Sequence, residues 1–204
     1  YIGPASVHDH FDALSLQGKA LQLYQACTDP IERQTLRDYL LNTPFRRDLF
    51  SRGRRAVSLA ERTQRLSDTR FAISTAPDRV SQTIDAPVGK VALKPEYVAA
   101  IVESLFERPR TLGELHQLPA LKGQGLPGVL QLVTALVGSG AITPCVEGEP
   151  DASAARRFNR SLAEQAVAGG EWNVFASPLT GAGLALTRIQ QLLVLGRERA
   201  GPQP

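Results

Sequence analysis

The chain has 204 residues, of which 43% are hydrophobic and 21% charged, and its formal net charge is +3. This composition is ordinary for a globular protein. Because no apolar run reaches the ~18 residues that a membrane span needs and no signal peptide opens the sequence, we expect a cytoplasmic protein without membrane contact. Cys27 and Cys145 are the only cysteines, too few for a metal knuckle or a disulfide framework.

Two helices are predicted at the beginning of the chain. Residues 7–26 have apolar side chains at rough helical spacing, which favours a first helix. Asp29 as N-cap and Pro30 in the first turn predict the start of a second helix, which ends before Pro44. The sequence starts at Tyr1 and contains no methionine, so we expect either a piece of a longer chain or modified methionines that the sequence omits.

The most charged stretch is 45–55, in which arginines alternate with Phe45, Leu49 and Phe50. One interpretation is contact with a protein or an anion, because guanidinium groups bind carboxylates and phosphates bidentately. The candidate contact residues are Arg46, Arg47, Arg52, Arg54 and Arg55. The other interpretation, which we favour, is a short amphipathic helix anchored by its two phenylalanines. Ten arginines stand against four acidic residues between positions 33 and 70, the main charge asymmetry of the chain.

Beyond position 70 the pattern changes to short strands joined by Pro and Gly turns. The predicted strands cover 71–74, 82–85 and 88–93. We expect them to form one small antiparallel sheet, in which residues 91–93 also pair with Ile142.

The region that organises the chain is 94–146. Its first helix is predicted from an apolar face at helical spacing, formed by Val98, Ile101, Val102, Leu105 and Phe106. Thr111 and Glu114 predict a capping box at the start of a second helix. A third, apolar helix starts near Pro127 and ends at Gly138 or Gly140, and a strand follows at 141–144. This order is that of a winged-helix unit.

Charge distinguishes between two uses of this winged-helix-like unit. A helix that reads DNA contacts phosphates and base edges through cationic or amide side chains. The candidate helix, 126–139, has no charged residue, and its one amide side chain is Gln131. We therefore interpret the unit as a packing or protein-docking module and do not expect nucleic acid as a partner.

The last part of the chain is predicted to be a linker and a helix–strand–helix segment. Residues 147–156 are polar and acidic, as in a linker. A helix over 156–168, a strand over 172–176 and an apolar helix over 184–195 follow. Thr180, Gly181 and Gly183 lie between this strand and the last helix, where backbone amides could hold an anion. They are a secondary candidate loop, because the third glycine of a dinucleotide motif is absent.

No other stretch forms a recognisable site. There is no P-loop and no nucleophile elbow. His8 and His10 point to different faces of a helix and lack a third ligand. We therefore predict no catalytic residue, no cofactor-binding residue and no metal ligand in this chain.

These expectations give a mainly α fold with small β-sheets (α+β), a helical segment plus a winged-helix-like domain. The predicted parts are a helical segment with an Arg-rich helix (1–70), short strands (71–93), the winged-helix-like unit (94–146), a linker (147–156) and a C-terminal helix–strand–helix segment (157–204).

Three blocks of the sequence carry a resemblance to a known family. They are DYLLNTPFRRDLFSRG (38–53), the block from RTLGELHQL to LVTALVGSGAITPC (110–145), and RFNR followed by ASPLTGAG (157–160 and 176–183). In this order they resemble the region downstream of the catalytic domain in bacterial methyltransferases that carry a methyltransferase regulatory domain, including the rickettsial-type protein lysine methyltransferases.

In that family, an upstream class I domain binds S-adenosylmethionine and the later parts help to recognise the protein substrate. The resemblance therefore implies a non-catalytic regulatory or substrate-recognition region with no cofactor of its own. Its partners would be the methyltransferase catalytic domain, a protein substrate, or both. A winged-helix transcriptional regulator that binds DNA and a free-standing interaction scaffold remain as alternatives, and the oligomeric state stays open.

Overall fold

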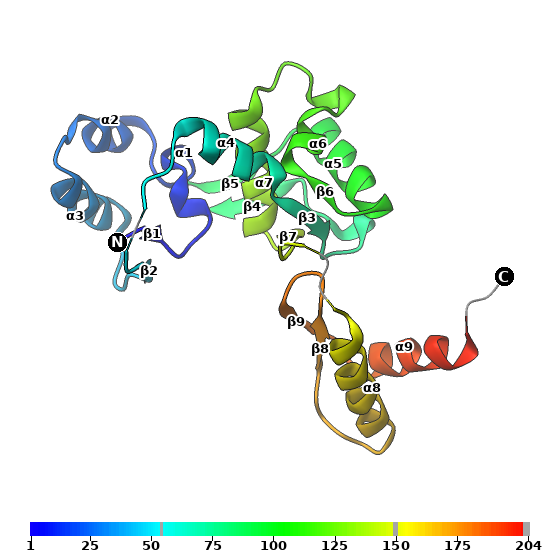
Figure 1. The fold of residues 1–204 in the computed structure, drawn as a ribbon. Helices are drawn as coiled ribbons and strands as arrows, with labels where there is room; N and C mark the ends of the chain where they lie inside the picture. Colours follow the sequence, from blue (N-terminus) through cyan, green and yellow to red (C-terminus); the bar gives the residue numbers. More distant parts are fainter. Residues whose placement is uncertain (54, 149–150, 202–204) are drawn as a thin grey trace. The chain divides into compact units, whose positions relative to one another are not determined.

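The computed structural model describes residues 1–53, 55–148 and 151–201. The fold is mainly helical with small antiparallel sheets, which confirms the α+β class expected from the sequence (Figure 1). The chain divides into two compact units, Tyr1–Pro144 and Cys145–Pro204. Within the described ranges, no helix is both long and apolar enough to cross a membrane.

The first unit begins with β1 (Gly3–Pro4) and three short helical pieces instead of one long helix. These pieces are η1 (His8–His10), α1 (Asp12–Ser15) and α2 (Gly18–Ala26). The predicted helix over 7–26 is wrong because the backbone of Leu16 and Gln17 is extended between α1 and α2. This break buries the Leu16 side chain, and Gly18 then resumes the helix with a φ of 57°, which glycine adopts at little cost.

Helix α3 (Pro30–Leu41) begins where the sequence predicts. The Asp29 carboxylate accepts hydrogen bonds from the backbone N–H groups of Ile31 and Glu32, both at 2.8 Å, and Pro30 occupies the first turn. Such a cap contributes about 1 kcal/mol. Helices α2 and α3 pack against each other and lie to one side of the first unit in Figure 1.

The predicted amphipathic helix over 45–55 is wrong. Instead, β2 (Asp48–Leu49) pairs antiparallel with β1. The N–H of Ile2 donates to the Leu49 carbonyl at 2.8 Å, and the N–H of Ala5 donates to the Arg47 carbonyl at 2.7 Å. This pairing holds the backbone extended, which is incompatible with the hydrogen bonding of a helix. Arg54 lies outside the described residues.

Helix α4 (Leu59–Asp68) is an element that the apolar pattern of the sequence does not reveal. None of its residues is buried, so it lacks the apolar stripe from which a helix is recognised. Ser58 caps it by accepting a hydrogen bond from the Glu61 N–H at 3.1 Å.

Two separate sheets replace the single predicted one. Strand β3 (Arg70–Ile73) lies between β6 (Arg110–Thr111) and β7 (Ile142–Pro144), and the 3-10 turn η2 (Pro77–Arg79) follows it. Strands β4 (Thr83–Ala86) and β5 (Gly89–Ala92) form a hairpin of their own. The expected pairing of residues 91–93 with Ile142 is wrong, since Val91 pairs with Ile84 and Ile142 with Ile73. A two-residue connection lets β4 and β5 pair locally.

Four helical elements form the largest core of the chain together with the β6–β3–β7 sheet. They are α5 (Pro95–Glu107), α6 (Leu112–His116), η3 (Pro119–Leu121) and α7 (Leu126–Gly138). Side chains that are less than 2% exposed fill this core: Ile101, Leu112, Leu115, Leu121, Val129, Val133, Leu136 and Ile142. Thr111 and Glu114 form the predicted capping box at the start of α6.

Phe106 is the exception to the predicted apolar face of α5, since it is exposed while the other four residues of that face are buried. At ~100° per residue, Phe106 lies about 80° around the helix from Val98, at the edge of the stripe. The apolar pattern therefore predicted the helix correctly but wrongly included Phe106 in its buried face.

A second, smaller cluster attaches the first helices to the rest of the unit. Leu14 of α1 packs with Ile84 of the β4–β5 hairpin and Ala135 of α7. The backbone N–H of Val88, in the hairpin turn, donates to the Leu14 carbonyl at 3.3 Å. The N-terminal helices are thus joined to the central core through few apolar contacts.

The second unit consists of α8 (Ser153–Val167), the hairpin of β8 (Val174–Ser177) and β9 (Ala182–Ala185), and α9 (Arg188–Ala200). Its core is formed by Leu162, Ala163, Phe175 and Leu195. The predicted helix over 184–195 starts too early, because residues 184–185 belong to β9 and a capping box at Thr187 begins α9. Helix α8 starts at Ser153, inside the predicted linker over 147–156.

Candidate functional site

The arginine-rich segment lies beside the N-terminus because β1 and β2 pair. The positive charge of Arg46 is compensated by acidic residues of the same chain. Its guanidinium forms ion pairs with Asp38 and Asp48, each at 3.2 Å, and lies 5.6 Å from the centre of the Tyr1 ring. Partial burial lowers the pKa of Arg46, but hydrogen bonding and charge attraction from Asp48 and Asp38 outweigh it, so the pKa is raised. Arg46 therefore fastens the strand pair to α3.

The other predicted contact arginines differ from Arg46. Arg47, Arg52 and Arg55 are exposed. Among the described residues, their guanidinium groups have no ion-pair or hydrogen-bond partner. Arg54, the fifth predicted contact residue, lies outside the described part of the chain. These three cations are thus available to a partner.

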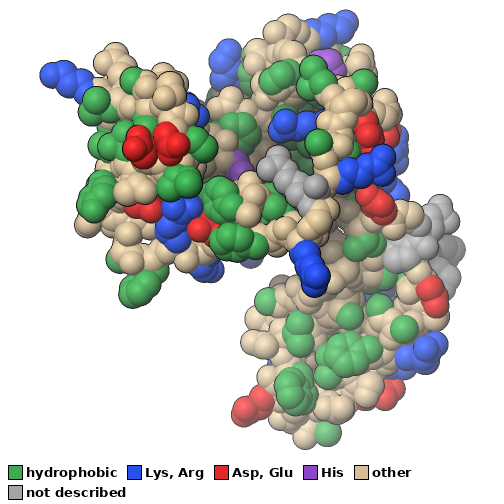
Figure 2. Space-filling view, turned by 60° about the vertical axis from the view of Figure 1, so that its left-hand side comes forward, with side chains coloured by type: hydrophobic (Ala, Val, Ile, Leu, Met, Phe, Trp, Pro, Cys, Tyr) green, Lys and Arg blue, Asp and Glu red, His purple; other side chains and the backbone are tan. Residues whose placement is uncertain are grey.

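Large apolar side chains accompany these arginines at the surface. Phe45 is 90% exposed and Phe50 is 73% exposed. The Phe50 ring makes an edge contact with the Tyr1 ring, with centroids 5.9 Å apart, and Leu49 of β2 is also exposed. We call this group the Arg–aromatic surface: Tyr1, Phe45, Arg47, Leu49, Phe50 and Arg52. In Figure 2, hydrophobic side chains and basic side chains (Lys and Arg together) lie intermixed on the surface of the first unit.

A buried polar network lies next to this surface, and no pattern in the sequence predicted it. Arg37 of α3 is 6% exposed. It donates to Asp9 at 2.9 Å and to the Ser15 hydroxyl at 2.7 Å, and that hydroxyl donates to Asp9 at 3.3 Å. Because desolvating a charge is costly unless it is paired, Arg37 depends on these partners. The network ties α3 to η1 and α1.

A cavity of about 170 Å³ adjoins the network. Its charged lining residues are three aspartates and three arginines: Asp9, Arg37, Asp38, Arg46, Arg47 and Asp48. Since the charges balance and most are paired with one another, this cavity does not select an anion.

His8 and His10 lie in η1 near this network. The His10 ring packs against β1, where a Cβ on Gly3 would come within 2.9 Å of it. In the ranges that the structure describes, no three His, Cys, Asp or Glu side chains are grouped as a metal site would require.

The secondary candidate loop lies in a strand-to-strand turn, so its predicted strand-to-helix position is wrong. Thr180 and Gly181 connect β8 to β9, and Gly183 lies within β9. The Gly181 N–H donates to the Ser177 carbonyl at 2.9 Å and the Thr180 N–H donates to the Ser177 hydroxyl at 3.3 Å. Because these two backbone N–H groups already donate within the turn, they are not free to bind an anion. The glycines have packing roles, since a Cβ on Gly181 would meet Val146 at 2.7 Å and one on Gly183 would meet Val174 at 2.8 Å.

Helix α7, the candidate DNA-reading helix, is buried along much of its circumference. Val129, Val133, Ala135 and Leu136 are buried, and Gln131 is its one exposed side chain that can hydrogen bond. The helix presents no cationic group, so it lacks the contacts that phosphate recognition requires.

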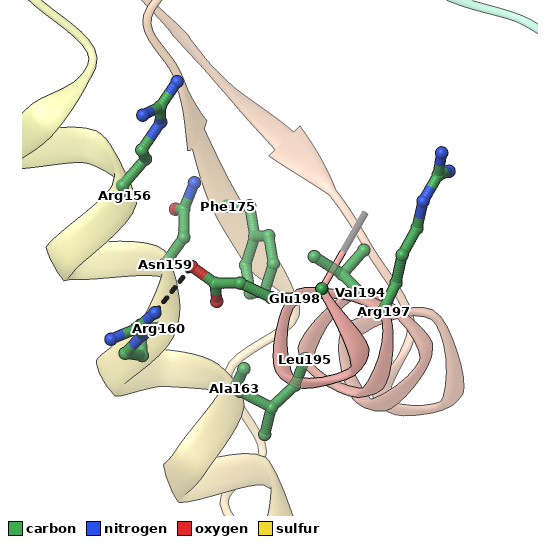
Figure 3. Close-up of a pocket in the computed structure, with 10 residues that line it drawn as sticks. Arg156, Asn159, Arg160, Ala163, Phe175, Val194, Leu195, Arg197 and Glu198 are labelled. Carbon is green, nitrogen blue, oxygen red and sulfur yellow. Dashed lines mark hydrogen bonds and ion pairs between the residues drawn. The ribbon is translucent and has the colours of Figure 1, made fainter. Parts of the chain in front are cut away.

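The second unit has a groove of about 610 Å³ between α8 and α9 (Figure 3). Its apolar lining comes from Ala163, Phe175, Val194 and Leu195. Its polar lining comes from Arg156, Asn159, Arg160, Arg197 and Glu198. Sequence reasoning missed this site, because its two walls are about 40 positions apart along the chain and no motif links them.

Comparison with known proteins gives a partial match to a family. Residues 1–52 match a family described as a predicted methyltransferase regulatory domain. The whole chain is 34% identical over 208 residues to an uncharacterized protein of Synechocystis sp. and spans 41% of that protein's length. No solved structure matches. The matched family segment contains all six residues of the Arg–aromatic surface.

Proposed function

We propose that this chain is the regulatory region of a methyltransferase that uses S-adenosylmethionine, and that its Arg–aromatic surface docks a protein. The observation that carries this proposal is a coincidence of position. The segment similar to a predicted methyltransferase regulatory domain, residues 1–52, also holds the three most exposed aromatic side chains among the described residues, Phe45, Tyr39 and Phe50. The docked protein is the catalytic domain or the protein substrate.

The chemistry of the surface favours a protein partner. Aromatic residues and arginines dominate the energetic centres of protein interfaces. Covering an exposed phenylalanine contributes about 25 cal/mol for each Å² of apolar area removed from water. Phe45 and Phe50 supply such area, and Arg47 and Arg52 supply unpaired cations for acidic groups on the partner.

The length of the relative agrees with an accessory role. More than half of the Synechocystis protein lies outside the match, which leaves room there for a catalytic domain. No P-loop, nucleophile elbow or complete dinucleotide motif is present in this sequence. We therefore assign the methyl-transfer step to another part of such a protein and propose that this chain binds no S-adenosylmethionine.

We further propose that α5, α6, α7 and the β6–β3–β7 sheet form a winged-helix-like module that serves protein packing. The order of helices and edge strands supports this description, whereas the central strand β3 precedes the helices in the chain. The absence of charge on α7 argues against a groove reader.

The test uses the full-length protein that contains this chain. Release of S-adenosylhomocysteine is measured with a protein extract of the source organism as the acceptor. The double substitution Phe45→Ser with Phe50→Ser should lower protein methylation by about tenfold, the effect expected when interface anchors are removed. Because both side chains are exposed, the free energy of unfolding should change by less than about 0.5 kcal/mol.

Phe106→Ser provides the matched control, since Phe106 is also exposed but lies outside residues 1–52. It should leave methylation unchanged. Equal activity of the double variant and this control would remove the docking role from the Arg–aromatic surface. Calorimetry of the 204-residue chain with S-adenosylmethionine should give no binding heat, and micromolar affinity would contradict the accessory assignment.

A further inference from the structure

The groove between α8 and α9 combines an apolar floor with charged walls. Phe175 and Leu195 are about 95% buried and form the floor, and Val194 is half-exposed on the α9 side. In Figure 3, Phe175 lies between the two helices, with Arg156 on the α8 wall and Arg197 on the α9 wall. The apolar surface is thus flanked by a cation on each side.

Some polar groups of the groove already have hydrogen-bond partners within the chain, and others have none among the described residues. Arg160 donates to Glu198 at 2.8 Å and joins the two helices across the groove; this hydrogen bond raises the pKa of Arg160. The Asn159 side chain exchanges two hydrogen bonds with the Ala176 backbone, at 2.7 and 2.9 Å. The guanidinium groups of Arg156 and Arg197 form no ion pair or hydrogen bond with any described residue. After hydrogen bonds from Ser153, the charge of Arg156 contributes to lowering the pKa of Asp151.

The groups without a described partner therefore carry a net positive charge into the groove. Glu198, the acidic lining residue, is already neutralised by Arg160. The guanidinium groups of Arg156 and Arg197 can each donate two hydrogen bonds to a carboxylate, sulfonate or phosphate. Among the described residues that line the groove, Glu198 is the one acid, and its ion pair with Arg160 leaves Arg156 and Arg197 open to an anion.

The size of the groove limits the ligand. Its α8 wall runs from Arg156 to Ala163, which corresponds to about 10 Å along a helix. An extended peptide advances ~3.3 Å per residue, so only about three residues would fit. The volume of about 610 Å³ lies within the range of small-molecule pockets, roughly 300–1,000 Å³.

We propose that this groove binds a small organic anion with an apolar body, such as an aryl or branched alkyl carboxylate. The apolar body lies on Phe175 and Leu195, and the anionic group is held by Arg156 or Arg197. This ligand site goes beyond the docking role of the first unit and does not depend on it. The other large cavity of this unit, about 650 Å³ beside the β8–β9 hairpin, is a poorer candidate because Asp151 is the one charged residue among the described residues that line it.

The probe for this site is 8-anilinonaphthalene-1-sulfonate, an aromatic anion whose fluorescence increases in apolar surroundings. The uncharged N-phenyl-1-naphthylamine has the same ring system without the sulfonate. The 204-residue chain is titrated with each dye. Arg156→Gln with Arg197→Gln should weaken binding of the sulfonate dye by about tenfold or more, because charge-assisted hydrogen bonds are lost. Binding of the uncharged dye should stay within about twofold, since the apolar floor is unchanged.

The matched controls are Arg157→Gln on α8 and Arg199→Gln on α9, which remove the same charges from the same helices at positions that do not line the groove. They should change binding of the sulfonate dye by less than about twofold. If the control substitutions and the groove substitutions weaken binding of the sulfonate dye equally, the loss reflects only the net charge of the chain, and the proposal fails.

A third substitution tests the floor and the charge together. Val194→Glu places a carboxylate on the wall of the groove without removing a buried side chain. Because this carboxylate repels the sulfonate, the substitution should weaken binding of the sulfonate dye more than binding of the uncharged dye. Dye bound at the exposed Phe45 and Phe50 would respond to none of these changes. Unchanged binding of the sulfonate dye in both the double variant and Val194→Glu would overturn the site.

Discussion

The central core and the N-terminal helices belong to one compact unit but are stabilised differently. Around α5, α6 and α7, large apolar side chains such as Leu115 and Leu136 are fully buried. In residues 1–53, ion pairs link α3 to η1 and to Arg46 beside β2, and Phe45 and Phe50 stay at the surface. The comparison teaches that large apolar side chains are almost all buried in the first region, whereas in the second several of the largest stay exposed, as the proposed docking role requires.

The largest loss of stability is expected for a substitution in the central core. Leu136→Ala removes a side chain with no exposed area, so it should lower the free energy of unfolding by about 2–5 kcal/mol. Phe106→Ala, an exposed position of the neighbouring helix α5, is the control and should change it by less than about 0.5 kcal/mol. Both are measured by chemical denaturation. Similar losses for the two variants would mean that Leu136 does not support the core.

A smaller effect is expected in the N-terminal helices. Arg37→Ala leaves Asp9 without its ion-pair partner, and breaking a fully buried pair costs roughly 3–5 kcal/mol. Since the Asp9 side chain keeps 24% of its exposure, we expect a loss of about 2 kcal/mol.

Arg47→Ala is the matched control for Arg37→Ala, because Arg47 is exposed and has no partner among the described residues. Its effect in chemical denaturation should be within about 0.5 kcal/mol. A loss for Arg37→Ala no larger than that of the control would show that apolar contacts alone hold these helices.

The smallest expected effect depends on pH. A hydrogen bond from Arg108, followed by one from the Thr111 backbone, lowers the pKa of Glu114 from 4.5 to about 2. A carboxyl group whose pKa is lower in the folded state stabilises the fold fully above pH 4.5 and loses this contribution as the pH falls towards 2.

Glu114→Gln should therefore lower the free energy of unfolding by about 0.5–1 kcal/mol at neutral pH, a value discounted for solvent screening. The difference between the variant and the original protein should shrink as the pH falls from 4.5 towards 2. Denaturation curves at several pH values check this. A difference independent of pH would contradict the assigned role of the Glu114 charge.

Elements with a local cause could be predicted from the sequence. Asp29 and Pro30 start α3, and Thr111 with Glu114 starts α6, because caps depend on residues within one turn. The apolar helix α7 was equally clear from its composition. The candidate arginines were recognised from their clustering, but which of them is already paired was not, because Asp38 and Tyr1 reach Arg46 only in the folded chain.

The sequence by itself determined the α+β class, the position of most helices and the concentration of arginines near the N-terminus. Tertiary structure alone decided three further features. The β1–β2 pairing replaced a helix, β3 separated from the β4–β5 hairpin, and the groove brought Arg156 and Arg197 to opposite walls. The physical reason is that strand pairing and cavities join residues far apart along the chain, whereas helices and their caps depend on neighbours.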